Sequence, residues 1–249
     1  MFIQPIAYNW DNYRNYAYFV ETDDFTLLVD AGNFQEIEQA LEKLGDKSPD
    51  YILLTHSHGD HTNGAAHLKE KYQSKVIASS YWDLPMADYN EQKAAELGFS
   101  FLHLPGHTEE SGLWLMDYKA QPYAIFAGDV LFSCGCGRQF QGTDERLLTA
   151  LKTVNRLSGD YLLYTGHEYT LTNVEFCLEH FSDDAPLQNY FQEVQSMSMV
   201  GEPTVPIQLS KEKQVNPFLR YNDDKLWKAI GATSPIDFVV KLRNLRDAY

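Results

Sequence analysis

The sequence predicts an α/β fold with a smaller helical region at its C-terminal end. Over residues 1–170, short apolar runs alternate with amphipathic helical stretches, which is the pattern of an α/β domain. After Tyr169 the remaining patterns are helical and are interrupted by the proline-containing loop GEPTVPIQL. A chain of 249 residues can bury one main core and a second, smaller one. We therefore predict two domains, residues 1–170 and residues 171–249.

The N-terminal region predicts two strands followed by a helix. The stretch NYAYFVETDDFTLLVDAGN contains two apolar runs that are joined by the polar turn Glu21–Asp24, and Gly32 closes the second run. The next stretch, FQEIEQALEKLGDK, places Ile37, Leu41 and Leu44 at helical spacing and stops at a glycine.

Six further short apolar runs predict strands: YILLT, KVIAS, SFLHL, GLWLM, YAIFA and YLLYT. Helices are expected at GAAHLKEKY and at TDERLLTALKTVNRL, where Thr143 can cap the first turn. In the C-terminal region, amphipathic helices are expected at NVEFCLEHF, PLQNYFQEVQSM and IDFVVKLRNLRDAY.

The charge and the apolar pattern argue against several classes of partner and compartment. The chain has 35 acidic and 20 basic residues and a net charge of −15, which repels nucleic-acid phosphates and anionic membranes. No apolar run reaches membrane-spanning length, and the N-terminus lacks the pattern of a signal peptide. The three cysteines lack a disulfide framework spacing, which fits a reducing compartment. We expect a cytoplasmic monomer that acts on a small molecule and needs a local basic patch if that molecule is anionic.

Candidate metal ligands follow four of the predicted strands. They are His56, His58, Asp60 and His61 after YILLT, His107 after SFLHL, Asp129 after YAIFA, and His167 after YLLYT. In open α/β sheets, sites assemble at this end of the strands. Three imidazoles within six residues would repel one another once protonated, and a bound cation gives a reason to keep them neutral and together.

These ligands divide into two possible metal sites. Imidazole nitrogen and carboxylate oxygen are the donors that borderline divalent metals accept. One metal could be held by His56, His58 and His107, and a second by Asp60, His61 and His167, with Asp129 bridging the two. A lone histidine is more often structural, and that interpretation applies to His67, His103 and His180.

With these residues in place, the sequence resembles the metallo-β-lactamase superfamily. THSHGDH is similar to its T-H-x-H-x-D-H motif, and LPGHT, FAGDVLF and YTGHEYT resemble its other ligand segments in the same order. Within the superfamily the chain resembles the glyoxalase II (hydroxyacylglutathione hydrolase) family, through CGCGRQFQGT, GHEYT and KLRNLRD. The resemblance implies a four-layer αββα sandwich that carries the metal site, with a C-terminal helical domain that binds substrate.

In that family the last three stretches bind glutathione, and the resemblance carries this role to Arg138, Phe140, Tyr169, Arg243 and Arg246. Arg243 and Arg246 lie three apart, so they would share one face of a helix. Guanidinium groups suit carboxylates, of which glutathione has two. The open alternative is that these arginines only solvate a surface helix. Phe140 lacks the hydroxyl that the family often has at this position.

The resemblance also implies a reaction and its cofactors. The reaction is hydrolysis of S-(2-hydroxyacyl)glutathione, chiefly S-D-lactoylglutathione, to glutathione and D-lactate in methylglyoxal detoxification. It needs two divalent metal ions, with zinc expected and iron or manganese as alternatives. Asp60 and Asp129 are the expected catalytic residues, because they would hold both the metals and a shared water whose pKa the metals lower. Asp30 is expected to orient a ligand imidazole.

Three other functions remain open at this point. A glutathione persulfide dioxygenase with a single iron uses the same fold, as do other metallo-β-lactamase-fold hydrolases, and the third alternative is a non-catalytic metal-binding protein. We expect no chemical role for Cys134 or Cys136, because the imidazole and carboxylate ligands already complete two sites. Arg220 is expected to pack between the two domains.

Overall fold

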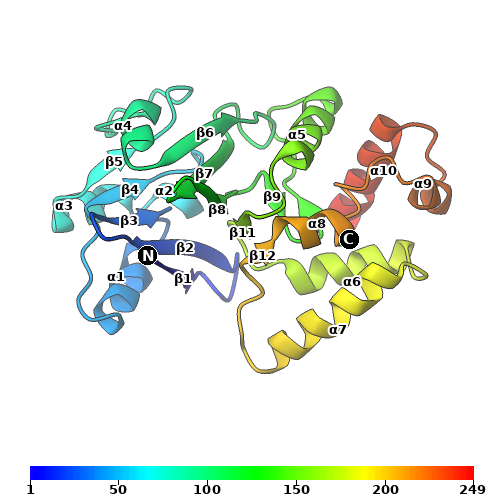
Figure 1. Cartoon of the computed structure of the whole chain (residues 1–249), viewed down its shortest axis with the longest axis horizontal. Helices are drawn as coiled ribbons and strands as arrows, with labels where there is room; N and C mark the ends of the chain where they lie inside the picture. The colour runs from blue at the N-terminus through cyan, green and yellow to red at the C-terminus, as the bar shows by residue number, and fades with distance from the viewer.

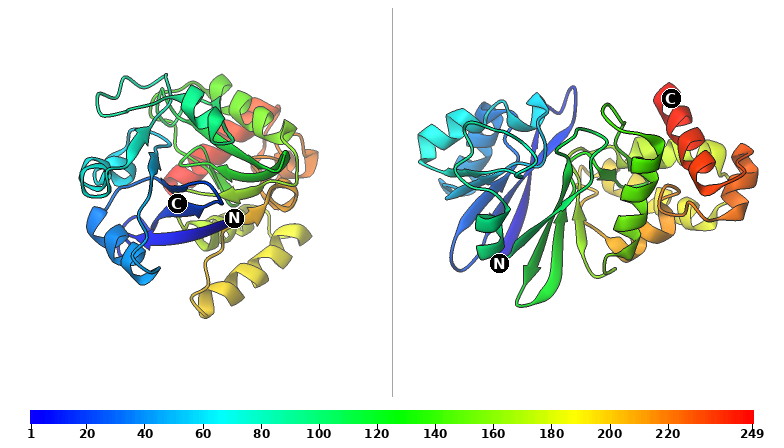
Figure 2. Two further views of the ribbon diagram at one scale, coloured as in Figure 1. Left: turned by 60° about the vertical axis from the view of Figure 1, so that its left-hand side comes forward. Right: turned by 90° about the horizontal axis from the view of Figure 1, so that it is seen from above.

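The two central layers of the structure are β-sheets packed face to face, and helices cover both outer faces. The computed structural model describes all 249 residues, and its layers are clearest in the right-hand view of Figure 2. There the N-terminal sheet and its helices lie on the left, the second sheet lies in the middle, and the remaining helices lie on the right. The predicted αββα sandwich is therefore confirmed.

The first sheet follows the order of the chain. Its strands are β1 (Phe2–Tyr8), β2 (Asn15–Glu21), β3 (Thr26–Val29), β4 (Tyr51–Leu53) and β5 (Lys75–Ile77). The first three pair antiparallel, whereas β3, β4 and β5 are parallel. The sequence did not predict β1, which contains Pro5; as an edge strand it can accommodate a proline.

The second sheet has the order β12-β11-β8-β7-β6 (Figure 1). Its strands are β6 (Phe99–His103), β7 (Gly112–Tyr118), β8 (Gln121–Phe126), β11 (Leu162–Tyr164) and β12 (Ile207–Gln208). β11 is parallel to β8, and the other pairs are antiparallel. A short hairpin of β9 (Leu131–Phe132) and β10 (Gly135–Cys136) follows the second ligand-bearing strand of this sheet. All eight predicted strands are present.

Alternating side chains of the strands fill two apolar layers. Tyr18 of β2 faces the second sheet and packs in one buried cluster with Phe126, whereas its neighbour Phe19 faces outward and packs with Ile37 and Leu41. This alternation is what buries both faces of the first sheet. The helices of the N-terminal half are α1 (Phe34–Lys43), the single turn α2 (Gly59–Thr62), α3 (Ala65–Tyr72) and α4 (Glu91–Glu96).

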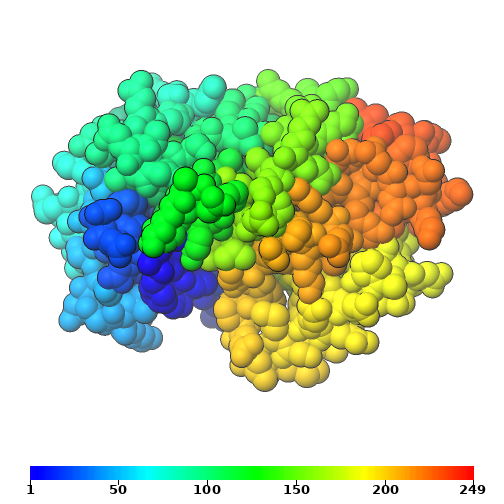
Figure 3. All heavy atoms as spheres, viewed as in Figure 1, coloured from blue at the N-terminus to red at the C-terminus, as the bar shows by residue number.

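The remaining helices share one core with the second sheet. They are α5 (Asp144–Arg156), α6 (Thr170–His180), α7 (Ala185–Met199), α8 (Leu209–Val215), α9 (Asp224–Ile230) and α10 (Pro235–Ala248). Thr143 caps α5 as predicted, because its side chain accepts the N–H of Arg146. Leu151, Leu163 and Phe238 belong to the same buried cluster. Figure 3 shows the C-terminal part gathered at one end of the molecule, and no helix is long and apolar enough to span a bilayer.

Candidate metal centre and substrate cavity

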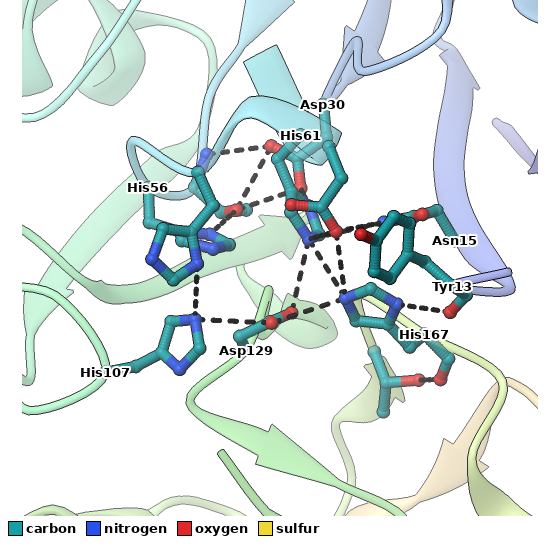
Figure 4. A network of polar contacts seen from close by, with 12 residues as sticks. Tyr13, Asn15, Asp30, His56, His61, His107, Asp129 and His167 are labelled. Atoms are coloured by element: carbon teal, nitrogen blue, oxygen red, sulfur yellow. Dashed lines mark hydrogen bonds and ion pairs between the residues drawn. The ribbon is translucent and has the colours of Figure 1, made fainter. Parts of the chain in front are cut away.

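The ligand-bearing strands deliver their side chains to one place. β3 and β4 are parallel in the first sheet, β8 and β11 are parallel in the second, and β6 runs in the direction of β8 because both are antiparallel to β7. All seven predicted ligands therefore meet at the carboxyl ends of these strands, and Figure 4 shows His56, His61, His107, Asp129 and His167 converging there. Gly32 and Gly166 allow this approach, since a Cβ would lie 1.7 Å from the Asp60 carbonyl oxygen and 2.5 Å from Asp129 Oδ1, respectively.

The potential ligand atoms form two groups. One group contains His56, His58, His107 and Asp129, and the other contains Asp60, His61 and His167, with all ligand atoms of a group within 4.8 Å of one another. In the first group, His107 Nε2 lies 2.8 Å from His58 Nδ1. In the second group, His61 Nε2 lies 3.2 Å from His167 Nε2. These are the two sets that the sequence predicts to hold separate metals.

Asp129 lies between the two groups and contacts both. Its Oδ1 is 3.3 Å from His61 Nε2, and its Oδ2 is 3.3 Å from both His107 Nε2 and His167 Nε2. A carboxylate in this position reaches both sets of imidazoles with its two oxygens. The geometry is that of a residue able to bridge two cations.

Backbone and side-chain oxygens orient three of the imidazoles by contacting their Nδ1 atoms. The Nδ1 of His61 lies 2.8 Å from Asp30 Oδ2, the Nδ1 of His167 lies 2.7 Å from the Tyr13 carbonyl oxygen, and the Nδ1 of His107 lies 2.9 Å from the Arg138 carbonyl oxygen. A proton on each Nδ1 leaves Nε2 as the lone-pair donor toward the centre. The contact expected of Asp30 is therefore present.

Burial and neighbouring charges set the protonation of the centre. Burial lowers the pKa of His56 well below its usual value. Burial alone would raise the pKa of Asp129, but the imidazoles of His167 and His61 hold it well below its usual range. Burial alone would lower the pKa of His61, but the Asp129 and Asp30 carboxylates raise it well above its usual value. A metal ion beside His61 would take the place of that proton.

Two buried atoms of the centre lack any hydrogen-bond partner. They are His56 Nε2 and Asp129 Oδ1; the 3.3 Å contact of Asp129 Oδ1 with His61 Nε2 lacks the geometry of a hydrogen bond. A buried polar atom without a hydrogen-bond partner lowers stability by about 1–3 kcal/mol. Both atoms have a lone pair that can coordinate a divalent cation. The residues present therefore fit a pair of divalent metals.

A cavity of about 390 Å³ opens over the centre. It is lined by ligands from both groups and by the five residues expected to bind substrate, Arg138, Phe140, Tyr169, Arg243 and Arg246. The exposed Phe140 ring stands edge-on to His58 and His107, with centroids 5.5 and 5.3 Å away. The Tyr169 ring stacks on His167 at 4.7 Å. Burial raises the pKa of Tyr169, so its hydroxyl stays protonated and can donate a hydrogen bond.

Three arginines line this cavity. Arg243 and Arg246 both line it, as their spacing on α10 predicted, and Arg138 joins them from the loop after β10. Asp247 Oδ1 accepts from Arg138 Nε and from Arg243 Nη2, both at 2.9 Å. Arg246 Nε donates to Asn173 Oδ1 at 3.1 Å. This is the local basic patch that an anionic substrate would need on an acidic chain.

Two residues that support the centre were not identified from the sequence. Asn15 is fully buried and its Nδ2 donates to Asp60 Oδ2 at 2.9 Å. The sequence marks Asn15 only as a polar residue at the start of an otherwise apolar strand. Glu110 is also buried, and its Oε1 accepts the backbone N–H of Ser57 at 2.9 Å, between the ligands His56 and His58. No local pattern marked Glu110.

The other polar candidates lie outside the centre. Cys134 and Cys136 are buried, and burial raises both thiol pKa values, that of Cys136 to about 11, so both thiols are protonated. Arg220 pairs with Asp184 and Asp223 at 2.6 and 2.8 Å. Both partners lie within residues 171–249, so these ion pairs connect parts of the C-terminal region and do not join the two predicted domains. Neither ligand group includes His67, His103 or His180.

Comparison with known proteins identifies relatives along most of the chain. Residues 10–115 match the family model of the metallo-beta-lactamase superfamily, and residues 168–249 match that of the hydroxyacylglutathione hydrolase C-terminus. A hydroxyacylglutathione hydrolase of Rhodopseudomonas palustris (strain BisB5) is 38% identical over 226 residues, which cover 87% of each chain. One from Xanthomonas oryzae pv. oryzae (strain MAFF 311018) is 34% identical over 242 residues, 92% of each chain.

Solved structures share the fold. ETHE1 from Myxococcus xanthus is 20% identical and superposes with a TM-score of 0.65 over 98% of this chain and 91% of that one. TTHA1623 in a di-iron-bound form is 28% identical, with a TM-score of 0.53 over 66% of this chain and 91% of that one. Because curated relatives above 30% identity span most of the sequence, the chain belongs to the hydroxyacylglutathione hydrolase family of the metallo-β-lactamase superfamily.

Proposed function

We propose that the protein hydrolyses S-(2-hydroxyacyl)glutathione thioesters, chiefly S-D-lactoylglutathione, to glutathione and a 2-hydroxy acid. The observation that carries this proposal is one cavity that is lined by members of both metal-ligand groups and by three arginines. Glutathione has two carboxylates, which paired guanidinium groups recognise well. The curated relatives named hydroxyacylglutathione hydrolase support the same reaction.

The two ligand groups supply the first part of the mechanism. When bound there, a pair of divalent metals would polarise the thioester carbonyl and lower the pKa of a water molecule. His56, His58 and His107 would hold one metal, and Asp60, His61 and His167 would hold the other. We assign Asp129 the bridging role because its carboxylate contacts both groups.

The chain's own carboxylates would then position the attacking water. The Asp60 side chain is one quarter exposed and lines the cavity, and Asn15 fixes one of its oxygens. Attack of the water oxygen on the carbonyl carbon breaks the carbon–sulfur bond, and the proton released by the water goes to the departing thiolate. No side chain has to act as the nucleophile, in keeping with the protonated, buried cysteines.

The three arginines would hold glutathione and so place the thioester over the centre. Arg243 and Arg246 lie on α10, and Asn173 and Asp247 fix their orientation. We propose that residues 171–249 act as the substrate-binding domain because they supply this pair. Tyr169 and Phe140 would contact the peptide part of glutathione from the cavity walls.

The ligand set also bears on which metal is bound. We propose zinc as the metal, with iron or manganese as alternatives, since all accept imidazole and carboxylate; the related TTHA1623 has been obtained in a di-iron-bound form. The unpaired, buried cysteines support a reducing, cytoplasmic location. We further propose that the protein acts as a monomer.

A persulfide dioxygenase with one iron is the competing function. The second ligand group, which is complete and shares Asp129 with the first, favours the hydrolase. The test is to follow thiol release from S-D-lactoylglutathione by the purified, zinc-loaded protein, with Asp129→Ala as the inactive control. Oxygen consumption on glutathione persulfide, with no thiol release from the thioester, would contradict the proposal.

A further inference from the structure

A second groove adjoins the metal centre on the side of Asp60. It has a volume of about 520 Å³ and shares two lining residues, Tyr13 and Asp60, with the substrate cavity. None of the three arginines lines it. In a substrate whose glutathione part is held at the arginines, the thioester carbonyl would lie at the metal centre. The acyl group on the other side of that carbonyl would then extend toward this groove.

Tyr13 forms the wall between the groove and the substrate cavity and is held in place by its backbone. The N–H groups of Asn12, Tyr13 and Arg14 all donate to the Asn9 carbonyl oxygen at 3.0 Å. The Tyr13 carbonyl oxygen lies 2.7 Å from His167 Nδ1. The Tyr13 side chain remains 56% exposed, and Figure 4 shows its ring beside His167. An exposed aromatic ring on a fixed backbone is suited to contact a ligand.

Four of the nine residues that line the groove carry side-chain amides. Asp60 is the only charged residue among those that line it. The Asn33 amide is already bonded to Asn9 Oδ1 and to Glu36 Oε1. The exposed side chains of Gln35 and Asn63 also line the groove, and neither amide takes part in an intramolecular hydrogen bond. They are free to donate to and accept from hydroxyl groups.

We propose that this groove is the acyl subsite and that it selects acyl groups with hydroxyls beyond the 2-position. Gln35 and Asn63 would hydrogen-bond those hydroxyls, and the Tyr13 ring would limit the width of the acyl group next to the centre. This inference rests on the proposed thioester hydrolysis and adds the acyl specificity of the same site.

The first test compares two thioesters that differ by one hydroxyl. S-(2,3-dihydroxybutanoyl)glutathione and S-(2-hydroxybutanoyl)glutathione are assayed with the wild type and with the double variant Gln35→Ala/Asn63→Ala. The ratio of their kcat/KM values should fall about fivefold in the variant, as expected for one lost hydrogen bond. The matched control is Gln192→Ala/Gln195→Ala, two exposed amides on α7, which should leave the ratio unchanged.

The second test concerns the Tyr13 ring between the groove and the substrate cavity. Tyr13→Ala keeps the carbonyl that orients His167, so it removes only the ring. The kcat/KM for S-mandeloylglutathione relative to S-D-lactoylglutathione should rise about tenfold, within the range for relief of a steric limit in a pocket. Trp10→Ala is the control, because this exposed aromatic of the same turn lines a different cavity.

The outcomes separate the two proposals. Unchanged ratios in both the double variant and Tyr13→Ala, with thioester hydrolysis intact, would overturn the acyl subsite and leave the proposed function standing. An equal loss on both butanoyl substrates would also overturn it, because the amides would then support the fold or the metals and not the acyl group. A wild type that cleaves no glutathione thioester would overturn both.

Discussion

Glu212 offers a worked prediction of stability because it is a carboxylate buried without a cation. It is fully buried on α8 and accepts the Cys134 N–H at 2.7 Å and the Ser133 hydroxyl at 3.0 Å. Burial raises its pKa from 4.5 to about 7, against the opposing effect of these hydrogen bonds. We predict that Glu212→Gln removes a pH-dependent loss of stability.

The sign follows from proton linkage. Between pH 4.5 and about 7 the folded protein keeps this proton and the unfolded chain releases it. The stabilisation that the raised pKa contributes is therefore fully present below pH 4.5 and is lost as the pH rises toward 7. At ~1.4 kcal/mol per pH unit, the free energy of unfolding falls by about 3 kcal/mol across this window. Glutamine has the same shape and no proton to lose, so the variant should not show this fall.

The assay is urea unfolding of the wild type and Glu212→Gln at several pH values from 4.5 to 8, with saturating zinc in all samples. Titration of the metal ligands is common to both proteins and cancels in their difference. Relative to the wild type, the variant should gain about 3 kcal/mol between the ends of the range. Glu175→Gln, an exposed carboxylate on α6, should gain nothing. Parallel pH profiles of the wild type and Glu212→Gln would refute the reasoning.

Three further predictions concern the site. Arg243→Ala/Arg246→Ala should raise KM for S-D-lactoylglutathione at least tenfold while kcat changes less, since these groups would bind ground state and transition state alike; a loss confined to kcat would contradict that role. Asp30→Ala should weaken metal binding at His61 by about 10–100-fold in a competitive chelator titration, as is usual for a lost support of a ligand imidazole, and an unchanged affinity would refute it. In the same titration, Glu110→Ala should weaken binding of the metal held by His56, His58 and His107. Glu109→Ala, a change at the exposed neighbouring residue, should leave that binding unchanged.

Local motifs made the centre predictable from the sequence. Each ligand follows a short apolar strand, and the rule that sites form at one end of such strands places the ligands together without knowledge of the pairing. The contact of Asp30 with His61 was predictable for the same reason, because Asp30 directly follows β3. Arg243 and Arg246 could be paired because three-residue spacing puts two side chains on one helical face.

Other features depend on tertiary contacts that no local pattern encodes. Glu110 supports Ser57 across 53 residues, and Asp247 joins Arg138 to α10 across 109. The second groove arises only where the turn of residues 9–14 meets α1 and α2. The division at residue 170 remains a prediction, because β12 and the C-terminal helices share the core of the second sheet.

We propose above all that two metals, held by the two ligand groups around Asp129, act together in thioester hydrolysis. The most direct measurement adds zinc in steps to metal-free protein and follows both bound zinc and the rate of glutathione release from S-D-lactoylglutathione. We predict binding of two zinc ions per chain, activity that reaches its plateau only at two equivalents, and loss of both when Asp129 is replaced by alanine. A plateau at one equivalent, or full activity in Asp129→Ala, would contradict it.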